Sequence, residues 1–159
     1  MLTMDVFIHM ETVDRNTWQG APDDRPLNDV GRRQAEVLAA DLTSEPVDAL
    51  YSSAAARAQQ SVEPLSAKTG LRVTVLPDFQ DTAEKAFGEL ERIHAANPDG
   101  RAIVCSYGDV IPALLAYLAE RYHLTPPARD NRRGVVFRVT YDGASGGLAV
   151  REPPVDFPK

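Results

Sequence analysis

A histidine follows the first apolar run of this chain, and its position predicts a role in chemistry. Residues 6–8 are apolar, and His9 is followed closely by a polar stretch that begins at Glu11. A buried strand that ends in this way places its last side chain at the edge of the sheet, where open α/β sheets bind ligands. An imidazole can act there as a nucleophile or a proton carrier near neutral pH. The alternative is that His9 only caps the core through a hydrogen bond.

Two later stretches carry polar side chains that could join His9. Residues 51–53 read Tyr-Ser-Ser at the end of a short apolar run, and Arg57 follows in the first turn of an expected helix. Residues 106–109 read Ser-Tyr-Gly-Asp after another apolar run. The carboxyl ends of parallel strands lie side by side, so we expect His9, Arg57 and Tyr107 to meet in space.

The elements that must position these residues alternate along the chain. Apolar residues at helical spacing predict helices after Asn28, over 54–69, over 81–96 and over the segment that contains Leu114 and Leu118. Strands are predicted at 5–8, 47–51, 71–76, 101–106, 135–140 and 148–150. This order predicts an α/β protein, a three-layer αβα sandwich with a mostly parallel central sheet and an antiparallel C-terminal hairpin, in a single domain over residues 1–159.

Composition excludes several classes of function. The 159 residues carry a formal net charge of −6, which argues against non-specific nucleic-acid binding because such binding needs a basic face. Cys105 lies in an apolar run, where we expect a buried thiol rather than a nucleophile. With no signal peptide and no apolar run near 18 residues in length, we expect a cytoplasmic protein with no membrane partner. The sequence shows no metal-ligand spacing, so we expect neither a metal nor a cofactor.

The order of these motifs resembles that of the histidine phosphatase superfamily, the phosphoglycerate mutase-like proteins. Residues 7–12 resemble the family's Arg-His-Gly-Glu-Thr, and residues 26–35 its Pro-Leu-Thr-x-x-Gly-x-x-Gln-Ala. Residues 51–61 resemble its second motif, and residues 104–111 its Val-Ser-His-Gly-Gly-Val-Ile. The likeness runs over nearly the full length. The chain is most similar to the short, phosphohistidine phosphatase-like members, because it nearly lacks the usual insertion after the third strand.

The resemblance implies a mechanism. In that family the first histidine attacks phosphorus and becomes phosphorylated, while two arginines and a second histidine hold the phosphoryl oxygens. An uncharged imidazole suits the attack, and fixed positive donors suit the charge that grows on the transferred group. Carried over by position, His9 is the nucleophile and Arg57 is a phosphate clamp.

Three positions depart from the family pattern. Ile8 stands where the family has an arginine, Met10 where it has a glycine, and Tyr107 where it has the second histidine. The loss of an arginine and a histidine would cost on the order of 10⁴ to 10⁶ in rate, so we expect no efficient phosphatase. Together with Trp18, these residues predict a more apolar, aromatic-lined cleft that suits an organic small molecule.

The leading hypothesis is therefore a repurposed member of this fold, which binds a small molecule or performs acid–base chemistry of the isomerase, cyclase or lyase type. Its predicted catalytic residues are His9, Tyr107 and Arg57. Further residues predicted to contact the substrate are Ile8, Met10, Glu11, Arg15, Trp18, Asp81, Glu84 and Asp109.

Two alternatives remain open. The first is a weak phosphomonoester or phosphohistidine phosphatase that still uses His9 and Arg57, and the second is a non-catalytic binding protein. Arg15 could restore part of the positive charge that the motif lacks. Arg132 and Arg133 could do the same, but two arginines in a polar segment are expected to be solvated.

Overall fold

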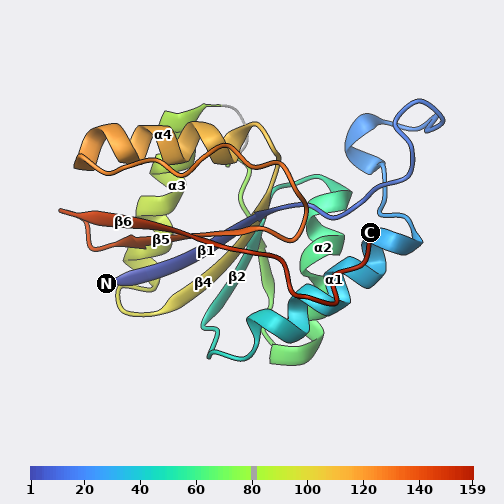
Figure 1. The fold of residues 1–159 in the computed structure, drawn as a ribbon, viewed down its shortest axis with the longest axis horizontal. Coiled ribbons are helices and arrows are strands. Elements are labelled where there is room, and N and C mark those ends of the chain that lie inside the picture. The colour runs from blue at the N-terminus through green and yellow to red at the C-terminus, as the bar shows by residue number, and fades with distance from the viewer. Residues whose placement is uncertain (80–81) are drawn as a thin grey trace.

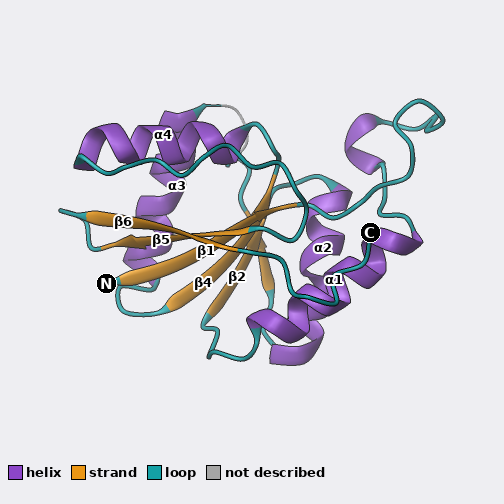
Figure 2. Cartoon of the chain, viewed as in Figure 1, coloured by secondary structure: helices purple, strands orange, loops and turns teal. Residues whose placement is uncertain are grey.

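A six-stranded sheet forms the centre of the computed structural model, which describes residues 1–79 and 82–159 (Figures 1 and 2). Its strands are β1 (Leu2–Ile8), β2 (Ala49–Ser52), β3 (Val73–Val75), β4 (Arg101–Ser106), β5 (Val136–Tyr141) and β6 (Gly146–Arg151). The spatial order is β3-β2-β4-β1-β5-β6. The first four strands run parallel, whereas β5 and β6 form an antiparallel hairpin against β1. The predicted sheet is therefore confirmed.

Four α-helices cover the two faces of the sheet, which confirms the predicted three layers. One face carries α1 (Asp29–Leu42) and α2 (Ala56–Thr69), and the other carries α3 (Ala83–Ala96) and α4 (Val110–Tyr122), as Figure 1 shows. The Asn28 side chain caps α1 by accepting a hydrogen bond from the Gly31 N–H at 2.8 Å. Gly70 ends α2 with a φ of 74°, a conformation that glycine adopts without strain.

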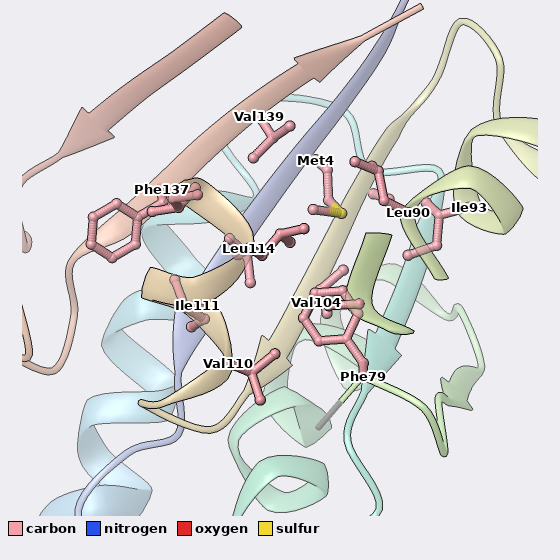
Figure 3. Close-up of a cluster of buried hydrophobic side chains, with 14 of the residues drawn as sticks. Met4, Phe79, Leu90, Ile93, Val104, Val110, Ile111, Leu114, Phe137 and Val139 are labelled. Carbon is pink, nitrogen blue, oxygen red and sulfur yellow. The ribbon is translucent and has the colours of Figure 1, made fainter. Parts of the chain in front are cut away.

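Strand β1 is fixed between two apolar layers because its side chains alternate between the faces. Met4 and Val6 join the cluster under α3 and α4, part of which Figure 3 shows. Phe7 points to the opposite cluster under α1 and α2, and all three side chains are fully buried. Burial of a side chain of this size contributes about 1.5–3 kcal/mol. The end of β1, and therefore His9, has a rigid support.

Backbone hydrogen bonds align the carboxyl ends of three neighbouring strands. The His9 N–H donates to the Ser106 carbonyl at 3.2 Å, and the Ser53 N–H donates to the Cys105 carbonyl at 3.0 Å. The hydroxyls of Ser53 and Ser106 lie 2.8 Å apart. The three sequence stretches that were expected to meet do so at this edge.

The backbone just after His9 is held by both helices of one layer. The Met10 N–H donates to Ser61 Oγ on α2 at 2.9 Å. On α1, Gly31 lies so close to this segment that an added Cβ would stand 1.9 Å from the Glu11 carbonyl oxygen. Only a residue without a Cβ fits there, so glycine at position 31 allows α1 to contact the segment that follows His9.

Some predicted boundaries shift in the structure. The strand predicted at 71–76 is paired only over Val73–Val75, at the edge of the sheet. The helix predicted from residue 54 begins at Ala56. Among the residues described, no helix has the length and apolar character needed to cross a membrane.

Candidate active site

A cavity of about 670 Å³ opens beyond the carboxyl ends of β1 and β4. It is walled by the segment after β1, the start of α2, the turn after β4 and the segment before β5. Figure 1 shows the first of these walls extending outward from the end of β1. Five of the lining side chains are arginines, namely Arg15, Arg25, Arg57, Arg129 and Arg133. Within the described part of the chain, the lining carboxylates are Asp23 and Asp109.

His9 lines this cavity as an uncharged imidazole. Its Nδ1 lies 2.9 Å from the Met10 carbonyl oxygen, so this nitrogen carries the ring proton and Nε2 keeps the free lone pair. Burial is the main reason that the pKa of His9 falls to about 4, and the positive charges of Arg57, Arg133 and Arg25 lower it further. At neutral pH the ring is therefore uncharged and available to act as a nucleophile.

Arg57 enters the cavity from the first turn of α2. Its Nη1 donates to the Pro22 carbonyl at 3.1 Å and lies 3.9 Å from the Asp23 carboxylate. The guanidinium stands 5.0 Å from the centroid of the Tyr107 ring, at a distance typical of a cation–π contact. Its Nε is buried and, within residues 1–79 and 82–159, has no hydrogen-bond partner. An unsatisfied buried donor of this kind is a ready contact for an anion.

Arg133 and Arg25 add charge on the other sides of His9. The Nε of half-buried Arg133 is also buried and finds no partner in the described part of the chain. Arg25 donates through Nη1 to Thr12 Oγ1 and to the Val13 carbonyl. Burial and then the positive charges of Arg57, Arg15 and Arg133 lower the pKa of Arg25.

Two other arginines and a tyrosine also line the cavity. Arg15 and Arg129 line the cavity from exposed positions in loops. Tyr107, in the turn after β4, is also part of the wall, and burial followed by the charge of Asp23 raises its pKa. Its phenol stays protonated at neutral pH and can donate a hydrogen bond.

Most of the predicted site residues line the cavity, but several do not. His9, Arg57, Tyr107, Ile8, Arg15 and Asp109 are all part of its wall. Met10 is fully buried in the cluster under α1 and α2, because its side chain points away from the cavity. The expectation that it contacts a ligand is wrong.

Trp18, Glu11 and Glu84 also lie outside this wall. The Trp18 indole donates to the Ala21 carbonyl at 2.8 Å within its own loop. Glu11 accepts from the Asn28 side chain at 2.9 Å and faces a second cavity near the C-terminal tail. Glu84 is exposed in the first turn of α3. Asp81 lies outside the described residues.

The predicted apolar, aromatic-lined cleft is wrong as a description of this cavity. Ile8 and Tyr107 do face it, but the arginines dominate its lining. Sequence reasoning missed Arg25 and Arg129 and assigned Arg133 to solvent. Neither residue period nor motif spacing marks these positions, since all three lie in segments without regular structure. The available signal was the excess of arginine in the loops that flank the motifs.

A neutral imidazole surrounded by guanidinium groups suits the transfer of a phosphoryl group. The imidazole can attack phosphorus, and the cations can stabilise the charge that develops on the phosphoryl oxygens. In the described part of the chain, no three or more His, Cys, Asp or Glu side chains lie close enough together to hold a metal ion.

Comparisons with known proteins find a curated relative over nearly the whole of this chain. The 8-oxo-(d)GTP phosphatase of Mycolicibacterium smegmatis is 30% identical over 156 residues, which cover 96% of this chain and 48% of that protein. The chain therefore spans about half the length of this curated relative.

Solved structures share the fold. The protein histidine phosphatase SixA, complexed with tungstate, superposes with a TM-score of 0.73 at 18% identity over 95% of this chain and 97% of that one. A mycobacterial glucosyl-3-phosphoglycerate phosphatase gives a TM-score of 0.76 at 17% identity over 96% and 99% of the two chains. The model of the histidine phosphatase superfamily (branch 1) matches residues 9–90, slightly more than half of the sequence and beginning at His9 itself. The chain belongs to the histidine phosphatase superfamily.

Proposed function

We propose that this protein is a phosphatase that hydrolyses its substrate through a phosphohistidine at His9. The observation that carries the proposal is the uncharged His9 ring on a cavity lined by five arginines. Two of these, Arg57 and Arg133, keep a buried Nε with no hydrogen-bond partner in the described part of the chain. Such donors fit an oxyanion better than an uncharged organic ligand.

The proposed reaction has two steps. In the first, Nε2 of His9 attacks phosphorus, a P–N bond forms, and the bond from phosphorus to the leaving-group oxygen breaks with its electron pair. The leaving group takes up a proton where its basicity requires one. In the second step water attacks phosphorus, the P–N bond breaks, and inorganic phosphate leaves while His9 returns to its neutral form. The hydrogen bond from Nδ1 to the Met10 carbonyl holds the ring in the tautomer that both steps need.

The arginines replace the charge that the first motif lacks. Ile8 cannot hold a phosphoryl oxygen, but Arg133 reaches the same cavity from the segment before β5 and affects the pKa of His9 directly. Arg57, from the first turn of α2, and Arg25, from the loop after β1, act on the same ring. This arrangement removes the main argument for a repurposed pocket, which was the loss of positive charge around His9.

The test is hydrolysis of p-nitrophenyl phosphate together with detection of the covalent intermediate. Replacing His9 with Asn should lower kcat by about 10⁴-fold or more, because the nucleophile is lost. After acid-free quenching, the wild type should carry an acid-labile, alkali-stable phosphate on His9, found by mass spectrometry. His94→Asn is the matched control, since His94 packs against Tyr141 on another part of the molecule and should leave turnover unchanged. Turnover that survives His9→Asn would overturn the proposal.

A further inference from the structure

The cavity holds more positive charge than one phosphoryl group needs. Among residues 1–79 and 82–159, its lining holds five arginines and two carboxylates, Asp23 and Asp109. Asp23 is largely exposed and lies 3.9 Å from Arg57. Among the described residues, no ion pair joins a carboxylate to any of the other four arginines. A phosphoryl group that carries two negative charges would leave a net positive charge on the walls.

The arginines fall into two tiers by burial. Arg57, Arg133 and Arg25 are at least half buried and act on the pKa of His9, so they surround the point of attack. Arg15 and Arg129 line the same cavity from exposed loops. Two cations at the rim, beyond the three that already surround His9, suit further anionic groups on the same substrate.

The two lining carboxylates that the structure describes, Asp23 and Asp109, do not suit an alkyl phosphate. To protonate an alkoxide leaving group, a carboxylic acid must stay protonated near neutral pH, which requires burial among apolar groups or close negative neighbours. Both Asp23 and Asp109 are exposed to solvent. A leaving group that departs as a phosphate or polyphosphate anion needs no such acid, because it is a weak base.

We infer that the substrate is a phosphoanhydride, a chain of two or more linked phosphates whose terminal phosphoryl group lies against His9. Arg57, Arg133 and Arg25 hold this terminal group, and Arg15 and Arg129 hold the phosphates behind it. Attack by His9 breaks the P–O bond of the anhydride, and the shortened polyphosphate leaves with the electron pair. The cleavage depends on the phosphatase activity proposed above, whereas the binding does not.

Binding is measured first and without turnover. Isothermal titration of the His9→Asn protein compares inorganic phosphate with inorganic tripolyphosphate at low salt. We expect tripolyphosphate to bind about tenfold tighter or more, because it also reaches the rim arginines. The wild type titrated with methylenediphosphonate, whose P–C–P bridge resists hydrolysis, gives a second reading in case His9→Asn fails to fold. If each protein binds inorganic phosphate as tightly as it binds its ligand with two or more phosphorus groups, the inference is overturned.

The rim is tested by its effect on the affinity ratio. Arg15→Gln combined with Arg129→Gln should lower the ratio of tripolyphosphate to phosphate affinity by about tenfold. The matched control combines Arg32→Gln with Arg72→Gln, which removes the same charge from exposed positions outside this cavity and should leave the ratio unchanged. If the ratio falls by a similar factor in both double variants, the change in net charge alone explains the effect, and the proposed role of Arg15 and Arg129 is overturned.

Turnover then distinguishes the possible sources of a second phosphate. Tripolyphosphate, GTP and GDP contain the anhydride, fructose 1,6-bisphosphate carries two separate phosphate esters, and glycerol 2-phosphate carries one. We expect kcat/KM for the anhydrides to exceed that for the esters by about tenfold or more. Preference for fructose 1,6-bisphosphate or glycerol 2-phosphate would overturn the anhydride assignment. If no compound is hydrolysed while tripolyphosphate still binds selectively, the proposed function fails and the anion site stands.

Discussion

Two groups of arginines, one beside the middle of β1 and one beyond its carboxyl end, differ in what surrounds them. The first group meets the Asp5 carboxylate, which is 1% exposed in the middle of β1. Arg101 Nη2 and Arg138 Nε each lie 2.8 Å from an oxygen of Asp5, and Arg138 also binds Glu45 at 2.8 Å. The second group lines the cavity beyond the end of β1, where Arg57 has one distant carboxylate neighbour, Asp23. The same residue type is neutralised in one place and left uncompensated in the other.

This difference separates a structural role from a functional one. The cations around Asp5 offset the cost of burying a carboxylate, and they also lower its pKa against the opposing effect of burial. The cations around the cavity repel one another, which is a cost in the free protein that a bound anion would recover. Removing a charge should therefore destabilise the first group and impair ligand binding or catalysis in the second.

The largest effect is expected at Asp5. Asp5→Asn leaves the buried Arg101 guanidinium without its partner and should lower the free energy of unfolding by about 3–5 kcal/mol, measured by urea denaturation. Turnover per folded molecule should stay near the wild-type value. Asp99→Asn is the control, because Asp99 is exposed and its loss should leave the free energy of unfolding nearly unchanged. A fall in activity without a loss of stability would break the comparison.

Arg57→Gln should show the opposite pattern. Losing this donor at the reacting group should lower kcat/KM for p-nitrophenyl phosphate by about 10²- to 10³-fold. The free energy of unfolding should be unchanged or slightly higher, since one of several like charges is gone. Steady-state kinetics and urea denaturation of the same preparation measure both. If the variant instead unfolds easily and keeps its activity, Arg57 belongs with the structural arginines.

The pH dependence of stability should carry the signature of His9. The pKa of the folded ring is about 4, mainly because of burial, against about 6.5 in the unfolded chain. Between these two pH values the unfolded chain binds a proton that the folded ring does not. The contribution of the neutral His9 ring to the free energy of unfolding is therefore complete above pH 6.5 and is lost as the pH falls toward 4. It amounts to about 3 kcal/mol. Urea denaturation from pH 7 to pH 4 should show the loss in the wild type relative to His9→Asn, and parallel curves would contradict it.

The sequence neighbours Arg132 and Arg133 allow an ion-paired surface arginine to be compared with an arginine that lines the cavity. Arg132 is exposed and binds Asp130 and Glu152 at 2.8 and 2.6 Å, whereas Arg133 lines the cavity. Arg133→Gln should lower kcat/KM by about 10- to 100-fold, the value of a charged hydrogen bond. Arg132→Gln should change it by less than about twofold. Equal effects of the two substitutions would remove the distinction.

The smallest effect is expected at Tyr107. Its ring stacks on Arg57 at 5.0 Å, so Tyr107→Ala should misplace the guanidinium and lower kcat/KM by about two- to fivefold. Tyr107→Phe keeps the ring and should retain most of that contribution. If the loss is the same in both variants, the hydroxyl and not the ring matters, and the contact with Arg57 is incidental.

The fold could be predicted from sequence because its signals are local. Apolar spacing, the Asn28 cap and Gly70 each define an element boundary through contacts within a few residues. The position of His9 followed from the same logic, since it comes directly after a buried parallel strand. Met10 was misplaced because its neighbour in sequence faces the cavity while its own side chain enters the core under α1 and α2.

The charge of the site could not be predicted because it comes from segments without periodicity. Arg129 and Arg133 lie between α4 and β5, where the chain path depends on tertiary packing. Whether Arg132 or Arg133 faces the cavity depends on where Asp130 and Glu152 lie, and Glu152 is 20 residues away in sequence. The motif positions alone therefore show that Ile8 stands where the family has an arginine, but they do not show the arginines that other segments bring to the cavity.

The contact between Gly31 and the Glu11 carbonyl has a consequence for genetics. Any side chain at position 31 would push the segment after His9 outward, even though this helix residue is buried and lies outside the arginine-lined cavity. A random-mutagenesis screen for inactive enzyme should therefore recover Gly31 substitutions beside those of His9 and Arg57. Suppressors of such alleles should map to the facing segment around Glu11.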